Sequence, residues 1–101
     1  MNKKVALLIG SESDRKTVEY SIDYFNYFGI KCDLRVMSAH RNPDDVAKFA
    51  KEARANGYSV LIGSAGMAAH LAGALKAHSS LPVIGIPLKG GVVDGLDSLL
   101  A

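Results

Sequence analysis

The stretch VALLIGSESD, residues 5–14, is the part of the sequence that decides the fold. It opens with five consecutive apolar residues, closes them with Gly10 and then becomes polar. An unbroken apolar run of this length, ended by a glycine, is typical of a strand buried on both faces of a parallel sheet. The same form recurs at residues 59–63 and 82–86, which predicts two further strands of this kind.

A fourth strand, residues 32–37, has a different pattern, because apolar and charged side chains alternate along it. Leu34 and Val36 fall on one side of such a strand. Asp33 and Arg35 fall on the other. A half-polar strand does not suit the middle of a covered sheet, so this pattern favours a position nearer an edge.

Helical spacing of apolar residues fills the segments between the strands. It predicts one helix over about residues 13–28, stopped at Gly29 and preceded by a capping box of Ser11 and Asp14. A second helix begins after Asn42, with Pro43 in its first position, and ends at residues 56–57.

A third helix is predicted over about residues 67–77. Its alanines and Gly73 favour close packing on the sheet. The alternation of strands and helices predicts an α/β fold, a three-layer doubly wound parallel sheet of the flavodoxin-like or Rossmann-like kind. We expect the strand order 2-1-3-4, with the usual further strand missing, in a single α/β domain spanning residues 1–101.

The amino-acid composition of the chain limits the classes of partner that we expect. The formal net charge is +2, and basic residues are scattered among acidic ones, which argues against a nucleic-acid partner. No apolar run approaches the roughly 20 residues of a membrane span, so we expect no membrane partner and a cytoplasmic location. Cys32 is the only cysteine, which excludes an internal disulfide, and we expect it to be packed in the core. So short a chain buries a modest share of its surface, which favours self-association.

Ligands of open parallel sheets bind beyond the carboxyl ends of the strands, where three loops of this chain should meet. The first loop, residues 10–14, offers the hydroxyls of Ser11 and Ser13 and free backbone N–H groups to a phosphate. It lacks both the Walker A and the complete GxGxxG pattern, so nothing supports dinucleotide binding. A capped turn without a ligand explains the same residues.

The second loop, residues 38–45, carries His40, which can exchange a proton near neutral pH, and Arg41, whose guanidinium suits a phosphate or carboxylate. A solvated His-Arg pair is the alternative. The third loop, residues 63–70, has glycines that leave backbone amides open, and His70 is either a site residue or a packed helix residue. The histidines lack metal-ligand spacing, so the residues alone predict a binder of a small phosphorylated molecule, with proton-transfer chemistry as a further hypothesis.

Three motifs in this order, GSESD, SAHRNP and AGMAAHLAG, resemble the PurE family, the N5-carboxyaminoimidazole ribonucleotide mutases of purine biosynthesis. The resemblance covers nearly the whole chain. It implies that a carboxylate moves from the exocyclic nitrogen of N5-carboxyaminoimidazole ribonucleotide to ring carbon 4, without a cofactor or metal. It implies His40 as the catalytic proton shuttle, and the implied substrate-binding residues are Ser11, Asp14, Ser38, Arg41, Ser64, Ala65, Gly66, Ala68 and His70.

Alternatives remain within and outside the family. A related branch carboxylates aminoimidazole ribonucleotide directly and tends to read SAHK, whereas this chain has Arg41 and residues 66–68 of the mutase type. Family members form octamers. They also continue past DSLL with another strand and further helices, and we expect this chain to lack that strand and those helices. A phosphate-binding module without catalysis and an inactive shortened remnant are the other two hypotheses.

Overall fold

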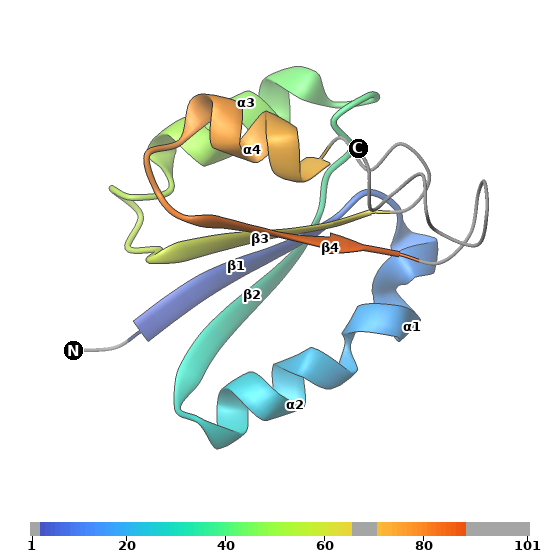
Figure 1. Cartoon of the computed structure of the whole chain (residues 1–101), viewed down its shortest axis with the longest axis vertical. Coiled ribbons are helices and arrows are strands. Elements are labelled where there is room, and N and C mark those ends of the chain that lie inside the picture. Colours follow the sequence, from blue (N-terminus) through green and yellow to red (C-terminus); the bar gives the residue numbers. More distant parts are fainter. Residues whose placement is uncertain (1–2, 66–70, 89–101) are drawn as a thin grey trace.

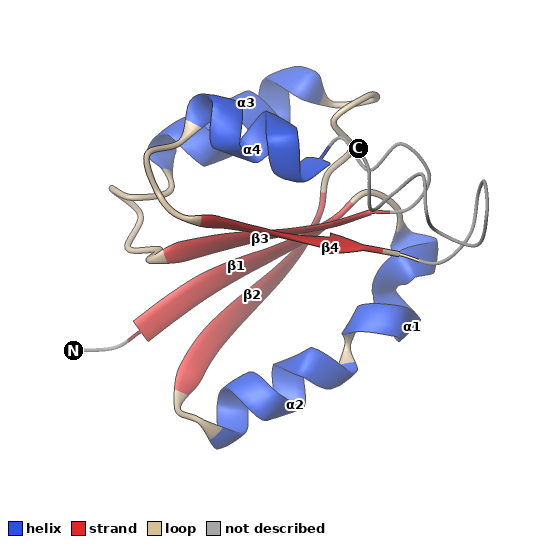
Figure 2. Cartoon of the chain, viewed as in Figure 1, coloured by secondary structure: helices blue, strands red, loops and turns tan. Residues whose placement is uncertain are grey.

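Four parallel strands form one sheet in the order β2-β1-β3-β4 in the computed structural model, which describes residues 3–65 and 71–88. The strands are β1 Lys3–Ile9, β2 Ile30–Val36, β3 Val60–Ala65 and β4 Val83–Pro87. Helices α3 and α4 cover one face of the sheet, and α1 and α2 lie on the other (Figure 1; Figure 2). The three-layer α/β fold and the strand order are therefore confirmed, as is the edge position of residues 32–37.

The face under α3 (Pro43–Glu52) and α4 (Leu71–His78) is closely packed. Alternate residues of β1, Ala6 and Leu8, point into it and are fully buried. They meet apolar side chains at helical spacing in these helices and directly after α3, namely Val46, Ala50, Ala53, Leu71 and Leu75, all buried. Burial of this kind is the main source of stability in a small domain.

Helix α3 was predicted to end at residues 56–57, but it ends at Glu52, and residues 53–57 form a turn that closes at the predicted glycine. The N–H of Tyr58 donates to the Ala53 carbonyl and the N–H of Gly57 to the Arg54 carbonyl, both at 3.1 Å. These two bonds form a Schellman motif, which requires a left-handed residue at the glycine position. Gly57 has φ of +93°, and Gly29 ends α2 with φ of +73°.

The helix predicted over residues 13–28 is not continuous, so that prediction is wrong in part. A 3₁₀ turn, η1 (Glu12–Asp14), leads into α1 (Arg15–Val18), and α2 (Tyr20–Tyr27) follows after a break at Glu19. The Ser21 hydroxyl donates to the Val18 carbonyl, and the Ile22 N–H donates to the Glu19 carbonyl. Serine bonding back to the preceding turn bends helices, which accounts for the change of direction between α1 and α2.

The prediction that residues 82–86 are buried on both faces is also wrong. Ile84 and Ile86 keep exposed fractions of 52% and 38%. They stand beside Ile62 and Ser64 of β3, on the face of α1 and α2. Those helices lie under the β2 side of the sheet rather than under β4, which explains the exposure (Figure 1).

Close packing of α4 involves its alanine Ala72 and glycines of the strands, but not Gly73, which corrects a third expectation in part. A Cβ atom at Gly73 would meet nothing within 4 Å. At Gly63 it would lie 2.8 Å from the Cα of Ala72, and at Gly85 3.3 Å from the Ala72 Cβ. Two strand glycines therefore let α4 approach β3 and β4.

The charged side of β2 is not a plain solvent face. Asp33 accepts a hydrogen bond of 2.7 Å from the hydroxyl of Tyr58, and the Lys4 ammonium lies 4.2 Å from the centre of the Tyr58 ring. Cys32, on the opposite side of β2, packs partly buried against the α1 and α2 core, and burial raises the pKa of its thiol. Across residues 3–65 and 71–88, no helix has the length and hydrophobicity of a membrane span.

Candidate functional site

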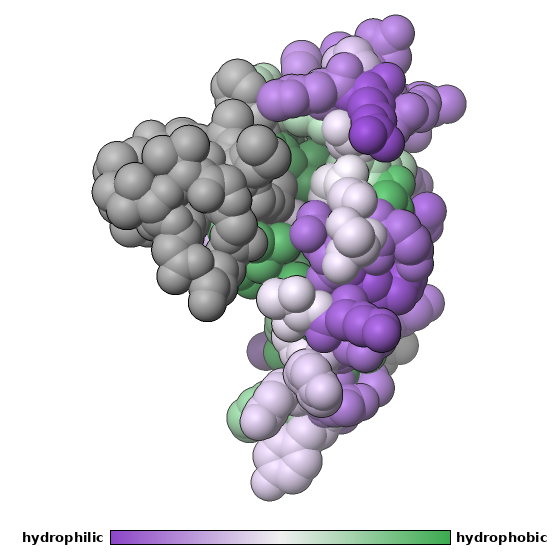
Figure 3. All heavy atoms as spheres, turned by 90° about the vertical axis from the view of Figure 1, so that its right-hand side faces the viewer, coloured by the Kyte–Doolittle hydropathy of each residue, from purple (hydrophilic) through white to green (hydrophobic). Residues whose placement is uncertain are grey.

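The carboxyl ends of β1, β2 and β3 lie in one row at the same edge of the sheet. Ile9 is paired with Val36 on one side and with Ser64 on the other. The Met37 N–H then donates to the Ile9 carbonyl at 2.9 Å, so the loops after β1 and β2 begin side by side. Figure 3 looks onto this edge, where apolar surface lies beside mainly hydrophilic side chains.

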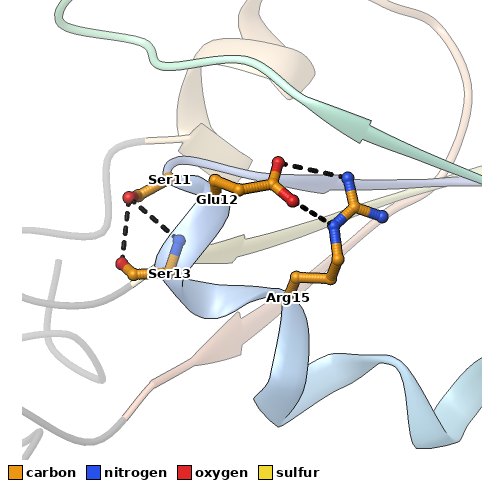
Figure 4. A network of polar contacts seen from close by, with 4 residues as sticks. All are labelled: Ser11, Glu12, Ser13 and Arg15. Carbon is orange, nitrogen blue, oxygen red and sulfur yellow. Dashed lines mark hydrogen bonds and ion pairs between the residues drawn. The ribbon is translucent and has the colours of Figure 1, made fainter.

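The first loop is shaped by Ser11. Its hydroxyl accepts a hydrogen bond of 3.3 Å from the Ser13 N–H and lies 2.9 Å from the Ser13 hydroxyl (Figure 4). Its carbonyl accepts from the Asp14 N–H at 3.0 Å. Ser11 thus caps η1 as predicted, but its hydroxyl accepts from the Ser13 N–H and not from the Asp14 N–H that a capping box uses, and the Asp14 side chain makes no capping bond to α1.

An ion pair lies in the same loop and was not predicted from the sequence. The guanidinium of Arg15 donates two hydrogen bonds to the carboxylate of Glu12, through Nε to Oε1 and through a terminal nitrogen to Oε2 (Figure 4). The hydrogen bond lowers the pKa of Glu12 and raises that of Arg15. The spacing of three residues, which suits a pair on one helical turn, was the available signal.

The second loop is shaped by Ser38. Its hydroxyl accepts from the backbone N–H groups of His40 and Arg41, at 3.2 and 3.1 Å. Its carbonyl accepts from the Asn42 N–H at 2.8 Å, directly before α3. Ser38 therefore fixes the backbone that carries His40 and Arg41, whose own side chains are exposed.

The third loop lies mostly outside the described residues, and with it the predicted site residues Gly66, Ala68 and His70. Ala65 is the last residue of β3. Ser64 is fully buried, and its hydroxyl has no hydrogen-bond partner among the residues that the structure describes. A buried hydroxyl without a partner is unusual, because desolvation is then not compensated.

The arrangement combines two kinds of group that chemistry on a small anion needs. Hydroxyls and cations of the first two loops can hold a phosphate, and an imidazole stands in the second loop. In the described parts of the chain, no three His, Cys, Asp or Glu side chains gather in a way that would hold a metal ion. The structure thus brings Ser11, Asp14, Ser38, Arg41 and His40 to one edge, with Ser64 beside them.

Comparison with known proteins gives a consistent result. The sequence model of the AIR carboxylase family matches residues 4–101. An N5-carboxyaminoimidazole ribonucleotide mutase of Brucella melitensis is 45% identical over 101 residues, which are the whole of this chain and 62% of that protein. One of Saccharolobus solfataricus is 44% identical over 98 residues, or 97% of this chain and 62% of that protein.

The fold is shared with a solved structure. The crystal structure of Treponema denticola PurE superposes with a TM-score of 0.87 at 28% identity, covering 99% of this chain and 65% of that one. The chain thus spans about three fifths of the length of the relatives that it matches.

Proposed function

This chain belongs to the AIR carboxylase family, and on that premise we propose that it acts as an N5-carboxyaminoimidazole ribonucleotide mutase. The observation that carries the proposal is the edge where the SAHR loop stands beside the GSESD loop, joined through Met37 and Ile9. An enzyme of this kind is an isomerase that forms 4-carboxy-5-aminoimidazole ribonucleotide for purine biosynthesis.

In the proposed mechanism, the substrate phosphate binds to Arg41 and the serine hydroxyls of the first loop. Asp14 is anionic like the phosphate, so we assign its carboxylate to a ribose hydroxyl or a loop amide. Ser38 holds the backbone of the second loop. We assign residues 64, 65, 66, 68 and 70 to the substrate as well, as the family resemblance implies. Binding energy from the phosphate end then fixes the imidazole ring of the substrate against His40.

The chemistry requires two proton transfers. His40 protonates the exocyclic nitrogen, and the bond between that nitrogen and the carboxyl carbon breaks to release carbon dioxide. Ring carbon 4 attacks the confined carbon dioxide, which depends on geometry more than on strong activation. Carbon 4 then loses its proton to His40, so one histidine is first acid and then base.

Replacing His40 by Asn tests this assignment. Conversion of the N-carboxylated to the C-carboxylated ribonucleotide should fall on the order of 10²- to 10⁴-fold, since general acid–base catalysis has that size, while ribonucleotide affinity survives. The matched control is His78→Asn, at the exposed end of α4. A His40→Asn variant that converts substrate as fast as the parent contradicts the proposal, and binding without turnover in the parent favours the phosphate-binding module.

The two branches of the family are separated by their substrates. Purified protein is offered N5-carboxyaminoimidazole ribonucleotide alone, and aminoimidazole ribonucleotide with bicarbonate, and the carboxylated product is followed spectroscopically. The mutase reading predicts turnover of the first without bicarbonate. The names of the relatives and Arg41 support it. Turnover by the 101-residue chain would exclude the inactive remnant.

We also propose that the protein is cytoplasmic, that residues 1–101 fold as one unit, and that it assembles with itself, as an octamer in line with the family resemblance. The exposed apolar side chains of α2 and, separately, of β4 support self-association, because exposed apolar surface marks contact sites. Light scattering on the purified chain measures the assembly directly. A monomer at all concentrations would contradict this part of the proposal.

A further inference from the structure

The ion pair of Glu12 and Arg15 separates two sides of the first loop. In Figure 4 the hydroxyls of Ser11 and Ser13 lie on one side of the turn, and the Glu12 carboxylate extends the other way, toward Arg15. Both charged side chains are well exposed, with exposed fractions of 68% for Glu12 and 42% for Arg15. The proposed mechanism uses neither of them.

In the sequence, Glu12 lies between Ser11 and Ser13. Its carboxylate is unfavourable in a loop that binds phosphate, because like charges repel. Glu12 is also the right kind of group to accept hydrogen bonds from serine hydroxyls. Without a partner it would compete with the phosphate for Ser11 and Ser13. The bidentate contact with Arg15 removes both problems, since it neutralises the charge and fixes the direction of the side chain.

We propose that this ion pair sets the affinity of the first loop for the phosphorylated substrate, with Arg15 as a positioning residue that acts through Glu12. The inference rests on the proposed function for the identity of the substrate. It assigns neither residue to the chemical step. Arg15 keeps the acid turned away from the hydroxyls, and removal of the acid leaves Arg15 as an additional cation near the phosphate.

The test uses ribose 5-phosphate as the probe, measured by calorimetry, with the variants Arg15→Gln, Glu12→Gln and their combination. Arg15→Gln should weaken binding about two- to fivefold, the size of exposed ion-pair effects. Glu12→Gln should strengthen binding by a similar factor, and the double variant should return close to the parent. Ribose 5-phosphate carries the phosphate without the imidazole, so the readout does not depend on turnover.

The salt dependence of the affinity distinguishes an effect of charge from an effect of loop structure. The three variants should differ at an ionic strength of about 0.01 M and converge near 1 M, where the screening length falls from roughly 30 Å to 3 Å. The matched control is Arg54→Gln, an exposed arginine beyond α3, at the opposite edge of the sheet, whose Nε donates to the Ser80 hydroxyl. It should leave the affinity unchanged.

Several outcomes would overturn the inference. Equal weakening by Arg15→Gln and Glu12→Gln would mean that the pair only holds the turn, and a difference that persists at high salt would exclude a charge effect. A parent that does not bind ribose 5-phosphate would also overturn it. In contrast, a parent that shows the expected order of affinities but converts no ribonucleotide supports the inference and contradicts the proposed function.

In turnover assays of an active parent, the same variants should change KM and leave kcat unaltered. This division distinguishes a residue that tunes binding from one that acts in the reaction. A fall in kcat with unchanged KM on Arg15→Gln would count against the assignment.

Discussion

The two faces of the sheet are built differently, although the same strands supply both. The face under α3 and α4 is closed over β1 and β3, where Ala6, Leu8 and Leu61 are fully buried, and strand glycines let α4 pack close. On the other face, Leu7 and Ile9 of the central strand β1 are buried. The row of paired residues that crosses the sheet at Ile9 is exposed at both of its ends. Val36 and Ile86, at those ends, have exposed fractions of 40% and 38%.

Helix α2, on the same side of the sheet, also carries exposed apolar side chains. Three of its aromatic residues, Tyr20, Tyr24 and Tyr27, are exposed, as is Phe28 directly after it. A hollow of about 320 Å³ is lined by Tyr24, Tyr27, Phe28 and Asp23. One face of the sheet therefore carries most of the stability, while the face under α1 and α2 retains exposed apolar surface for other contacts.

The largest expected effect is a test of the closed face. Leu8→Ala should lower the free energy of unfolding by about 2 to 5 kcal/mol, because the side chain is fully buried in the core under α3. Ile84→Ala removes a residue of the same size class from the open face and should lower it by at most about 1 kcal/mol. Urea unfolding measures both, and equal losses would contradict the comparison.

A second test adds one methyl group, either in β3 where it contacts α4 or on the exposed side of α4. Gly63→Ala should destabilise by about 1 to 3 kcal/mol, because the new Cβ would lie 2.8 Å from the Ala72 backbone. Gly73→Ala, with nothing within 4 Å, should stabilise by roughly 0.5 to 1 kcal/mol, since alanine favours a helix interior. Thermal unfolding of both variants measures these changes. A Gly63→Ala variant as stable as the parent would show that α4 can move away from β3.

Much of the fold could be predicted because its signals are local. The buried run of β1, the alternation in β2 and the Schellman end at Gly57 each depend on neighbouring residues. The exposure of Ile84 could not be predicted, because it depends on where α2 lies across the sheet. The break at Glu19 also escaped prediction, since apolar spacing continues through it while Ser21 bonds back to Val18.

The site could be predicted in its loops but not in its details. Parallel topology brings Ser11 and Ser38 to one edge, and a sequence with strand ends at these positions implies that result. The roles of the hydroxyls depend on backbone geometry, so the hydrogen bonds that the Ser38 hydroxyl accepts from the His40 and Arg41 N–H groups were not foreseen. The buried hydroxyl of Ser64 was not foreseen either, because pattern alone does not reveal a missing partner.

A third test concerns the polar contact on the closed face. Tyr58→Phe removes the hydroxyl that donates to Asp33 and should lower the free energy of unfolding by about 1 kcal/mol near neutral pH. Burial, followed by the bond to Asp33, raises the pKa of Tyr58. Folding therefore favours the protonated phenol, and this contribution is complete below about pH 10 and lost as the pH rises through the folded-state value.

The parent should consequently lose stability more steeply than Tyr58→Phe above about pH 10, and the gap between them should close. Denaturant unfolding at a series of alkaline pH values measures it. A constant gap across that range would mean that the phenol is not perturbed by its surroundings.

The smallest expected effect lies on the open face, at Ser64. Because its buried hydroxyl has no partner in the described parts of the chain, Ser64→Ala should leave stability unchanged or raise it by about 0.5 to 1 kcal/mol. The same variant should weaken binding of ribose 5-phosphate if the hydroxyl serves the ligand, as the proposed site implies. Greater stability together with weaker binding would identify a group retained for function at the expense of folding. A loss of stability would instead mean that the Ser64 hydroxyl makes a structural hydrogen bond in the free protein, and its assignment to the substrate would then fail.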